Sequence, residues 1–256
     1  MIPAERHKTI LSLLSQHEVI SINELVEQLN VSHMTIRRDI VKLEKLGKVL
    51  SVSGGVQLTT VLHQEPSHDA KVMQHASEKV AIGHIASQLV LKNSTVYLDA
   101  GTTTLEIAHQ LAMRDDLLFI TNDFVIATYL IHHSKSDLYH TGGRVDRENL
   151  SSVGSKVSDF LSGMNIDVAF VSTSSWNLRG ISTPSEPKVS VKKAVSVAAQ
   201  KVILVSDSSK YGKIATFHAL DIQSFDAVIT DASFPVSVRQ ELEDKGIQVL
   251  IGNEVC

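Results

Sequence analysis

The chain has 256 residues, of which 43% are hydrophobic and 20% are charged, and its formal net charge is −4. This composition indicates a globular protein of one or two domains and excludes a disordered, collagen-like or coiled-coil protein. The only cysteine, Cys256, excludes an intramolecular disulfide. We expect a soluble, cytoplasmic protein with no membrane partner, because the sequence has neither a signal-peptide core nor an apolar stretch of the roughly 20 residues that span a bilayer.

The charge is distributed unevenly along the chain. Residues 1–60 carry seven Lys and Arg side chains and six acidic ones, whereas the remainder is acidic. Five of these seven basic side chains fall between positions 37 and 48. Contact with DNA depends on local clusters of positive charge rather than on net charge. The N-terminal sixty residues are therefore a candidate DNA-binding segment.

Residues 1–58 are predicted to form three short helices and a β-hairpin. Apolar residues at 10–14 give the first helix a buried face. Ser21 and Glu24 match a capping box at the start of the second helix, whose apolar face spans residues 25–29. A tight turn at Asn30 and Val31 then leads to the third helix, for which Ser32 is the N-cap candidate.

The third predicted helix ends near Lys45 and has a basic outer face. Ile36, Ile40 and Leu43 recur at helical spacing and face the core, so the opposite side is free to contact DNA. The predicted DNA-binding residues are Ser32, His33, Met34, Thr35, Arg37, Arg38, Lys42 and Lys48. Two short helices joined by a tight turn, the second with such a face, indicate a helix-turn-helix. The alternative is a three-helix packing domain whose charges are merely solvated.

Residues 49–53 alternate with period two after Gly47, and Gly54-Gly55 can turn the chain back toward Val56. This pattern predicts a hairpin, which would serve as the wing of a winged helix-turn-helix. Residues 59–75 show no sustained period and contain Pro66, so we expect a linker there.

Residues 76–256 are expected to form an α/β domain. Helical periodicity returns over residues 76–91, and apolar runs then alternate with helical stretches. The predicted strands are 96–98, 117–120, 138–140, 168–172, 202–206, 227–230 and 249–251. The predicted helices are 103–112, 123–133, 155–162, 187–199 and 236–245. This alternation indicates a Rossmann-like parallel sheet covered on both faces.

Polar and glycine residues follow five of the predicted strands, where ligands bind in open α/β sheets. Gly101 and the start of a helix at Thr102–Thr104 offer free N–H groups to an anion, and Lys210 adds a positive charge. Neighbouring amide and carboxylate groups could bind sugar hydroxyls. The predicted effector-binding residues are Asp99, Gly101, Thr102, Thr103, Thr104, Thr121, Asn122, Gly142, Gly143, Glu186, Asp207 and Lys210. The alternative for any single loop is ordinary turn and cap chemistry.

No cofactor or metal is expected. The sequence contains neither a dinucleotide-binding nor a P-loop pattern, and none of its twelve histidines has zinc-ligand spacing.

Two sets of residues resemble the DeoR family of bacterial transcriptional regulators. Residues 29–40, with Leu43, Gly47 and Gly54-Gly55, resemble the winged helix-turn-helix signature of that family. The second set resembles its sensor domain and consists of residues 99–104, Thr121-Asn122, Gly142-Gly143, Glu186, Lys192–Ala194 and 207–212. In one departure, Ser51 and Ser53 stand where the family's wing commonly carries an Arg and a His.

This resemblance implies a sensor domain similar in fold to ribose-5-phosphate isomerase. It also implies a repressor of a carbohydrate or sugar-acid operon that binds operator DNA and a phosphorylated sugar or sugar-acid effector. We expect a homo-oligomer, either a dimer or a tetramer. The alternative is a sugar-phosphate isomerase with an appended DNA-binding domain, for which Glu186, Asp146 and Glu148 are the candidate proton-transfer groups. The related isomerases carry a motif that resembles Asp-Gly-Ala-Asp-Glu after the third strand. In this chain Gly142-Gly143-Arg144-Val145 replaces most of those acidic residues, so we expect that the protein is not an enzyme.

Overall fold

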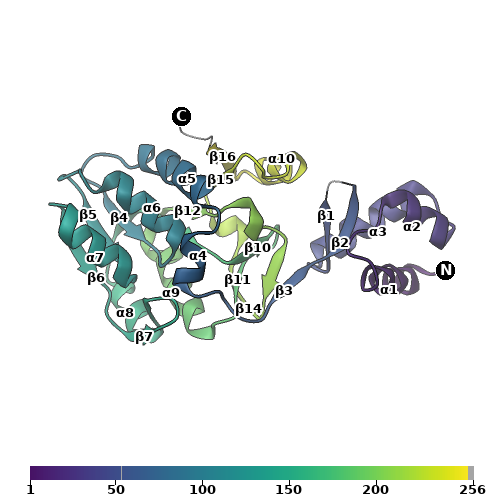
Figure 1. Ribbon diagram of the computed structural model, residues 1–256, viewed down its shortest axis with the longest axis horizontal. Helices are drawn as coiled ribbons and strands as arrows, with labels where there is room; N and C mark the ends of the chain where they lie inside the picture. The colour runs from purple at the N-terminus through teal and green to yellow at the C-terminus, as the bar shows by residue number, and fades with distance from the viewer. Residues whose placement is uncertain (53, 253–256) are drawn as a thin grey trace.

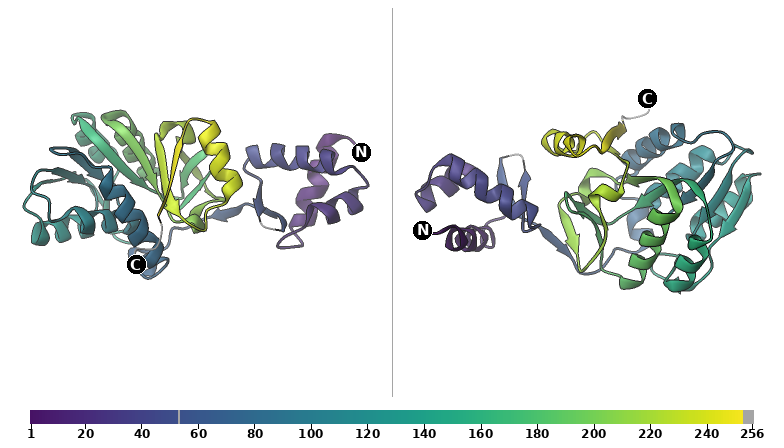
Figure 2. Two further views of the ribbon diagram at one scale, coloured as in Figure 1. Left: turned by 90° about the horizontal axis from the view of Figure 1, so that it is seen from above. Right: turned by 180° about the vertical axis from the view of Figure 1, so that it is seen from behind.

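The computed structural model describes residues 1–52 and 54–252, so Ser53 of the wing and Cys256 lie outside the described residues. Figure 1 and Figure 2 show a small helical domain and a larger α/β body lying end to end, with strand β3 between them. The elements of the helical domain are α1 (Pro3–Leu14), α2 (Ile22–Leu29), α3 (His33–Lys45), β1 (Val49–Val52) and β2 (Gly55–Leu58). The predicted three helices and hairpin are thus confirmed.

The N-terminal helices begin and end where their sequence signals indicate. The Ser21 side chain accepts a hydrogen bond from the Glu24 backbone N–H at 3.2 Å, and the Glu24 carboxylate accepts one from the Ser21 N–H at 2.8 Å. Asn30 ends α2 in the left-handed conformation with a φ of 49°. Ile10, Leu25 and Ile36 are fully buried in the core that the three helices share with the hairpin.

A seven-stranded parallel sheet forms the centre of the body, in the order β16-β15-β12-β9-β4-β5-β6. These strands are β4 (Thr95–Leu98), β5 (Leu118–Thr121), β6 (Asp137–His140), β9 (Ile166–Ser172), β12 (Ala199–Val205), β15 (Ala227–Asp231) and β16 (Gln248–Gly252). All seven predicted strands lie in it, and the parallel α/β fold is confirmed.

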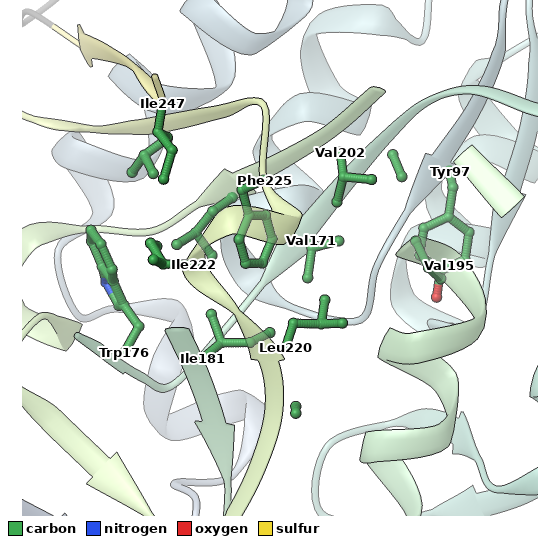
Figure 3. Close-up of a cluster of buried hydrophobic side chains, with 14 of the residues drawn as sticks. Tyr97, Val171, Trp176, Ile181, Val195, Val202, Leu220, Ile222, Phe225 and Ile247 are labelled. Carbon is green, nitrogen blue, oxygen red and sulfur yellow. The ribbon is translucent and has the colours of Figure 1, made fainter. Parts of the chain in front are cut away.

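Helices cover both faces of this sheet. One apolar core contains residues of α5 (Ala76–Gln88), α6 (Thr102–Leu111) and α7 (Phe124–His133). The other contains residues of α8 (Ser155–Ser162), α9 (Glu186–Ala198) and α10 (Val236–Asp244). Figure 3 shows part of the second core, where Phe225, Ile222 and Trp176 lie among aliphatic side chains.

Several short elements were not expected from the sequence. They are the hairpin β7 (Arg144–Asp146) and β8 (Ser151–Val153), the strands β10 (Ser175–Asn177), β11 (Gly180–Thr183), β13 (Lys213–Ala215) and β14 (Phe217–Asp221), and the 3-10 helices η1 (Ser208–Lys210) and η2 (Ile222–Ser224). The expected linker, residues 59–75, contains β3 (Thr60–Leu62) and α4 (His68–Val72). β3 pairs in parallel with β13, so this segment packs on the body instead of running free.

The wing contacts the body through Leu50 of β1. Leu50 is only 9% exposed and belongs to the same apolar cluster as Trp176 and Tyr211 of the body. Gly212 has a φ of +80°, and a Cβ atom there would lie 2.2 Å from Leu50 Cδ2. Glycine is therefore required at this contact both by its backbone conformation and by the close approach of Leu50.

Within the described ranges, none of the helices combines the length and apolar character needed to cross a membrane.

Candidate DNA-binding and effector sites

The outer face of α3 presents the predicted DNA-binding side chains to solvent. His33, Met34, Arg37, Arg38 and Lys42 are all exposed, as is Lys48 just beyond the helix. In the described part of the chain, the three basic residues of this face take part in no ion pair. These cations are therefore free to contact phosphates and base edges.

Ser32 and Thr35 have a structural role at the start of the same helix. The Ser32 hydroxyl accepts a hydrogen bond from the Thr35 N–H at 3.3 Å, and the two hydroxyls are 2.9 Å apart. This cap fixes the first turn of α3, where recognition helices contact bases.

A buried ion pair fixes α3 to α1. Asp39 accepts hydrogen bonds from both Arg6, at 3.1 Å from Nη2 to Oδ1, and His7, at 2.8 Å. Burial alone would raise the pKa of Asp39, but these hydrogen bonds outweigh it and the pKa is lowered. The carboxylate is therefore charged at neutral pH and holds the inner side of the recognition helix in place.

An open groove of about 520 Å³ separates α3 from the wing, with Arg37 and Val41 on one side and Ser51 on the other. The backbone N–H of Ser51 donates to the Glu44 carboxylate at 2.9 Å, and its hydroxyl donates to the same carboxylate at 3.3 Å. Ser51, which replaces a basic residue of the resembled wing, thus joins the wing to the recognition helix.

Two adjoining hollows lie at the carboxyl edge of the parallel sheet. Both are lined by Glu65, Ala100 and residues 172–174, and their free volumes are about 20 and 30 Å³. Each has room for one or two water molecules as it stands. This is the edge at which open α/β sheets bind ligands.

The first hollow is lined by a buried polar network around Asp99. Lys192 donates to Asp99 Oδ2 at 2.6 Å and to the Ser172 carbonyl at 2.7 Å. Asn122 accepts hydrogen bonds from the Tyr97 hydroxyl and the Ala100 N–H at 2.9 and 3.0 Å. The fully buried Ser151 hydroxyl lines this hollow and has no hydrogen-bond partner among the described residues. The hollow therefore offers several polar groups to a hydroxylated ligand.

The second hollow combines a helix N-terminus with lysines. Gly101, Thr102 and Thr103 line it at the start of α6, together with Lys79 and Lys210. Burial lowers the pKa of Lys79, partly opposed by the charge of Asp207. Free N–H groups, a helix dipole and ammonium groups together favour an anion such as phosphate.

Asp207 and Lys210 also brace their own loop. Lys210 Nζ lies 3.6 Å from Asp207 Oδ2, and Asp207 accepts hydrogen bonds from the N–H and hydroxyl of Ser209. Both line the second hollow, so a bracing role and a ligand-binding role are compatible with this geometry.

Five predicted effector residues do not line either hollow. Thr104 donates to the carbonyls of Asp99 and Gly101, and Thr121 donates to the Leu98 carbonyl, so both brace the loops. Gly142, Gly143 and Glu186 are exposed outside the hollows.

Several charged residues of the hollows were not among the predicted site residues: Glu65, Lys71, Lys79, Lys188 and Lys192. Only Lys192 belonged to a recognised motif. The others come from the expected linker, α5 and α9, where an isolated charge normally indicates a solvated surface.

Comparison with known proteins gives matches over both domains. Residues 6–61 match the DeoR-like helix-turn-helix domain, and residues 74–232 match the DeoR C terminal sensor domain. The chain is 54% identical to an uncharacterized HTH-type transcriptional regulator of Haemophilus influenzae, over 98% of both chains. It is 32% identical to the glycerol-3-phosphate regulon repressor of Escherichia coli, again over 98% of each.

Among solved structures, the ribose 5-phosphate isomerase A of Methanocaldococcus jannaschii matches with a TM-score of 0.41 and 15% identity, over 54% of this chain and 55% of that one.

Proposed function

Because the chain belongs to the DeoR family of helix-turn-helix transcriptional regulators, we propose that it represses a carbohydrate or sugar-acid operon under the control of a phosphorylated sugar or sugar-acid effector. The observation that carries this proposal is the second hollow, where the N-terminus of α6 and the three lysines Lys71, Lys79 and Lys210 meet at the edge of the sheet. The glycerol-3-phosphate regulon repressor, a relative over nearly its whole length, carries a phosphorylated compound in its name.

In this proposal the phosphate binds at Gly101–Thr103 with Lys79 and Lys210, and the hydroxyls bind around Asp99 and Asn122. The exposed face of α3 binds the major groove of the operator while the wing contacts the flanking backbone. The protein acts in the cytoplasm as a dimer or tetramer, since helix-turn-helix proteins bind paired half-sites.

Regulation without catalysis is the favoured form of this proposal. The carboxylates considered for an isomerase, Asp146, Glu148 and Glu186, line neither hollow. Asp99 does line one, but Lys192 occupies its Oδ2 atom. An assay for pentose-phosphate isomerisation should detect no turnover; turnover that Asp99→Asn abolishes would contradict this.

The effector site is tested with Lys210→Ala. An operator selected from random duplexes is bound by the protein, and phosphorylated sugars and sugar acids are titrated into the complex. Coupling between effector and DNA of about 1–3 kcal/mol corresponds to a roughly 5- to 150-fold change in operator affinity. Lys210→Ala should keep the effector-free affinity and lose this response. Lys156→Ala, which removes an exposed lysine of α8, should behave as wild type. An unshifted titration midpoint in Lys210→Ala would remove this residue from the site.

A further inference from the structure

Glu65 extends from the segment between the two domains into the wall that both hollows share. Its Oε1 atom accepts hydrogen bonds from Lys71 Nζ at 3.0 Å and from the Ser174 hydroxyl at 2.6 Å. Its Oε2 atom accepts one from Lys188 Nζ. The Glu65 side chain is only 14% exposed. Residues 62–73 lie between the two matched family regions, so neither match covers Glu65.

These contacts form a receptor for a carboxylate. Two ammonium groups and a hydroxyl donate to the two oxygens, and charge-assisted hydrogen bonds of this kind are the strong ones. Burial raises the pKa of Glu65, but Lys188 and Lys71 outweigh it and hold the pKa well below its ordinary range. Lys188 lies on α9 and Ser174 follows β9, so both donors belong to the body and remain there whatever the linker does.

The hollows are small because Glu65 lies between them. Their free volumes of about 20 and 30 Å³ hold water but not a sugar phosphate. Glu65 lines both, so its withdrawal would join the polar network around Asp99 to the anion site at the start of α6. The fully buried hydroxyl of Ser151, which also lines the first hollow and has no hydrogen-bond partner among the residues that the structure describes, is an independent sign that this hollow accepts a polar ligand.

We propose that Glu65 occupies the subsite for a carboxylate of the effector, so that the effector is a phosphorylated sugar acid which displaces Glu65 from Lys188 and Ser174. This inference rests on the proposed function and deepens it. The phosphate binds at the N-terminus of α6, and the acid end binds where the Glu65 carboxylate now lies.

Displacement of Glu65 would also affect the DNA-binding domain, through the segment that connects the two domains. Glu65 lies three residues after β3, which pairs with β13 immediately after the loop that carries Lys210. On its other side β3 continues from the wing, where the Thr59 N–H donates to the Lys48 carbonyl at 3.2 Å. Effector binding therefore releases the segment that positions the wing, which gives the site a direct connection to the operator.

The subsite is tested first without any effector, by chemical rescue of Glu65→Ala. Removing the side chain leaves Lys71 without its carboxylate and Lys188 with only Asp146, whose Oδ2 lies 3.9 Å from Lys188 Nζ, so added acetate should raise the melting temperature of Glu65→Ala by about 2–4 °C more than that of wild type. Neutral acetamide should not. Glu27→Ala, which removes an exposed glutamate of α2, controls for general salt effects. Equal acetate shifts in all three proteins would overturn the subsite.

The effector class is tested with matched pairs of an acid and an aldehyde: 3-phosphoglycerate with glyceraldehyde 3-phosphate, 4-phosphoerythronate with erythrose 4-phosphate, and 6-phosphogluconate with glucose 6-phosphate. At one chain length, wild type should bind the acid at least tenfold more tightly. Glu65→Gln keeps the shape of the side chain but competes less, so it should bind that acid at least fivefold more tightly than wild type. Lys188→Met should abolish the preference.

The outcomes separate this inference from the proposed function. Equal binding of acids and aldehydes in wild type, Glu65→Gln and Lys188→Met would overturn the carboxylate subsite and leave a sugar-phosphate sensor. Binding of no compound to wild type or Glu65→Gln would overturn the proposed function itself. If Glu65→Ala does not fold, Glu65→Gln and Lys188→Met still decide the question.

Discussion

Replacing Leu50 with alanine should undock the wing from the body while leaving both domains folded. A buried Leu→Ala change costs about 2–5 kcal/mol, and the lower half of that range applies here because Leu50 lies at a domain contact that can relax. A loss of about 2.8 kcal/mol is a hundredfold change in the ratio of docked to undocked wing. Coupling between effector and operator is typically 1–3 kcal/mol, so this loss is large enough to abolish it.

The protein contains one tryptophan, and it reports on this contact. Trp176 lies in the same cluster as Leu50, with its ring centroid 5.0 Å from that of Tyr211. Urea unfolding followed by Trp176 fluorescence should show this loss of stability in Leu50→Ala. Leu58→Ala is the matched control, because Leu58 lies on the same hairpin but packs in the core of the helical domain. An unchanged fluorescence transition in Leu50→Ala would refute the reasoning.

Three further predictions concern DNA binding, pH and the linker. Arg38→Ala should weaken operator binding by about 1–3 kcal/mol in gel-shift assays and leave the melting temperature unchanged, since Arg38 is exposed on α3; unchanged affinity would mean that this face does not bind the operator. The folded-state pKa of Lys79 is lowered, chiefly by burial, so Lys79 loses its charge at a lower pH than a free lysine. The affinity for glucose 6-phosphate, measured by calorimetry, should therefore fall as the pH rises from about 7 to 10, and Lys79→Arg should flatten this profile; a wild-type profile that is already flat would contradict it. Limited proteolysis should cut within residues 59–75, at the exposed His63 and Gln64, and leave a C-terminal fragment that still self-associates; a monomeric fragment would place the oligomer contacts in the helical domain.

The inner strands of the main sheet were predictable because they are largely buried and read as apolar runs, whereas the edge strand β6, with the sequence DLYH, is only partly buried. β9 and β12 are the clearest examples. β10, β11 and β14 were not predictable, because each has only three to five residues of mixed polarity. β10 and β11 form a local hairpin, and β11 pairs on its other side with β14, which is distant in the chain, as in Ser182 opposite His218.

The candidate effector site likewise has one part that the sequence predicts and another that it does not. The proposed anion site at the start of α6 follows from local sequence, because a glycine and three threonines at a helix N-terminus are a recognisable sequence pattern. The role of Glu65 does not follow from local sequence, because its partner Lys188 is 123 residues away and no periodicity links the two. Pairs of this kind depend on how the completed fold brings segments together, which no window of sequence contains.

The pairing of β3 with β13 has a consequence for the order in which a newly made chain matures. The helical domain, residues 1–58, is complete on leaving the ribosome, but β3 cannot pair until residues 213–215 have also been made. At about 5–20 residues per second, roughly 150 intervening residues take about 8–30 seconds to synthesise. During that interval the helical domain of each nascent chain is not yet joined to the α/β body by the pairing of β3 with β13.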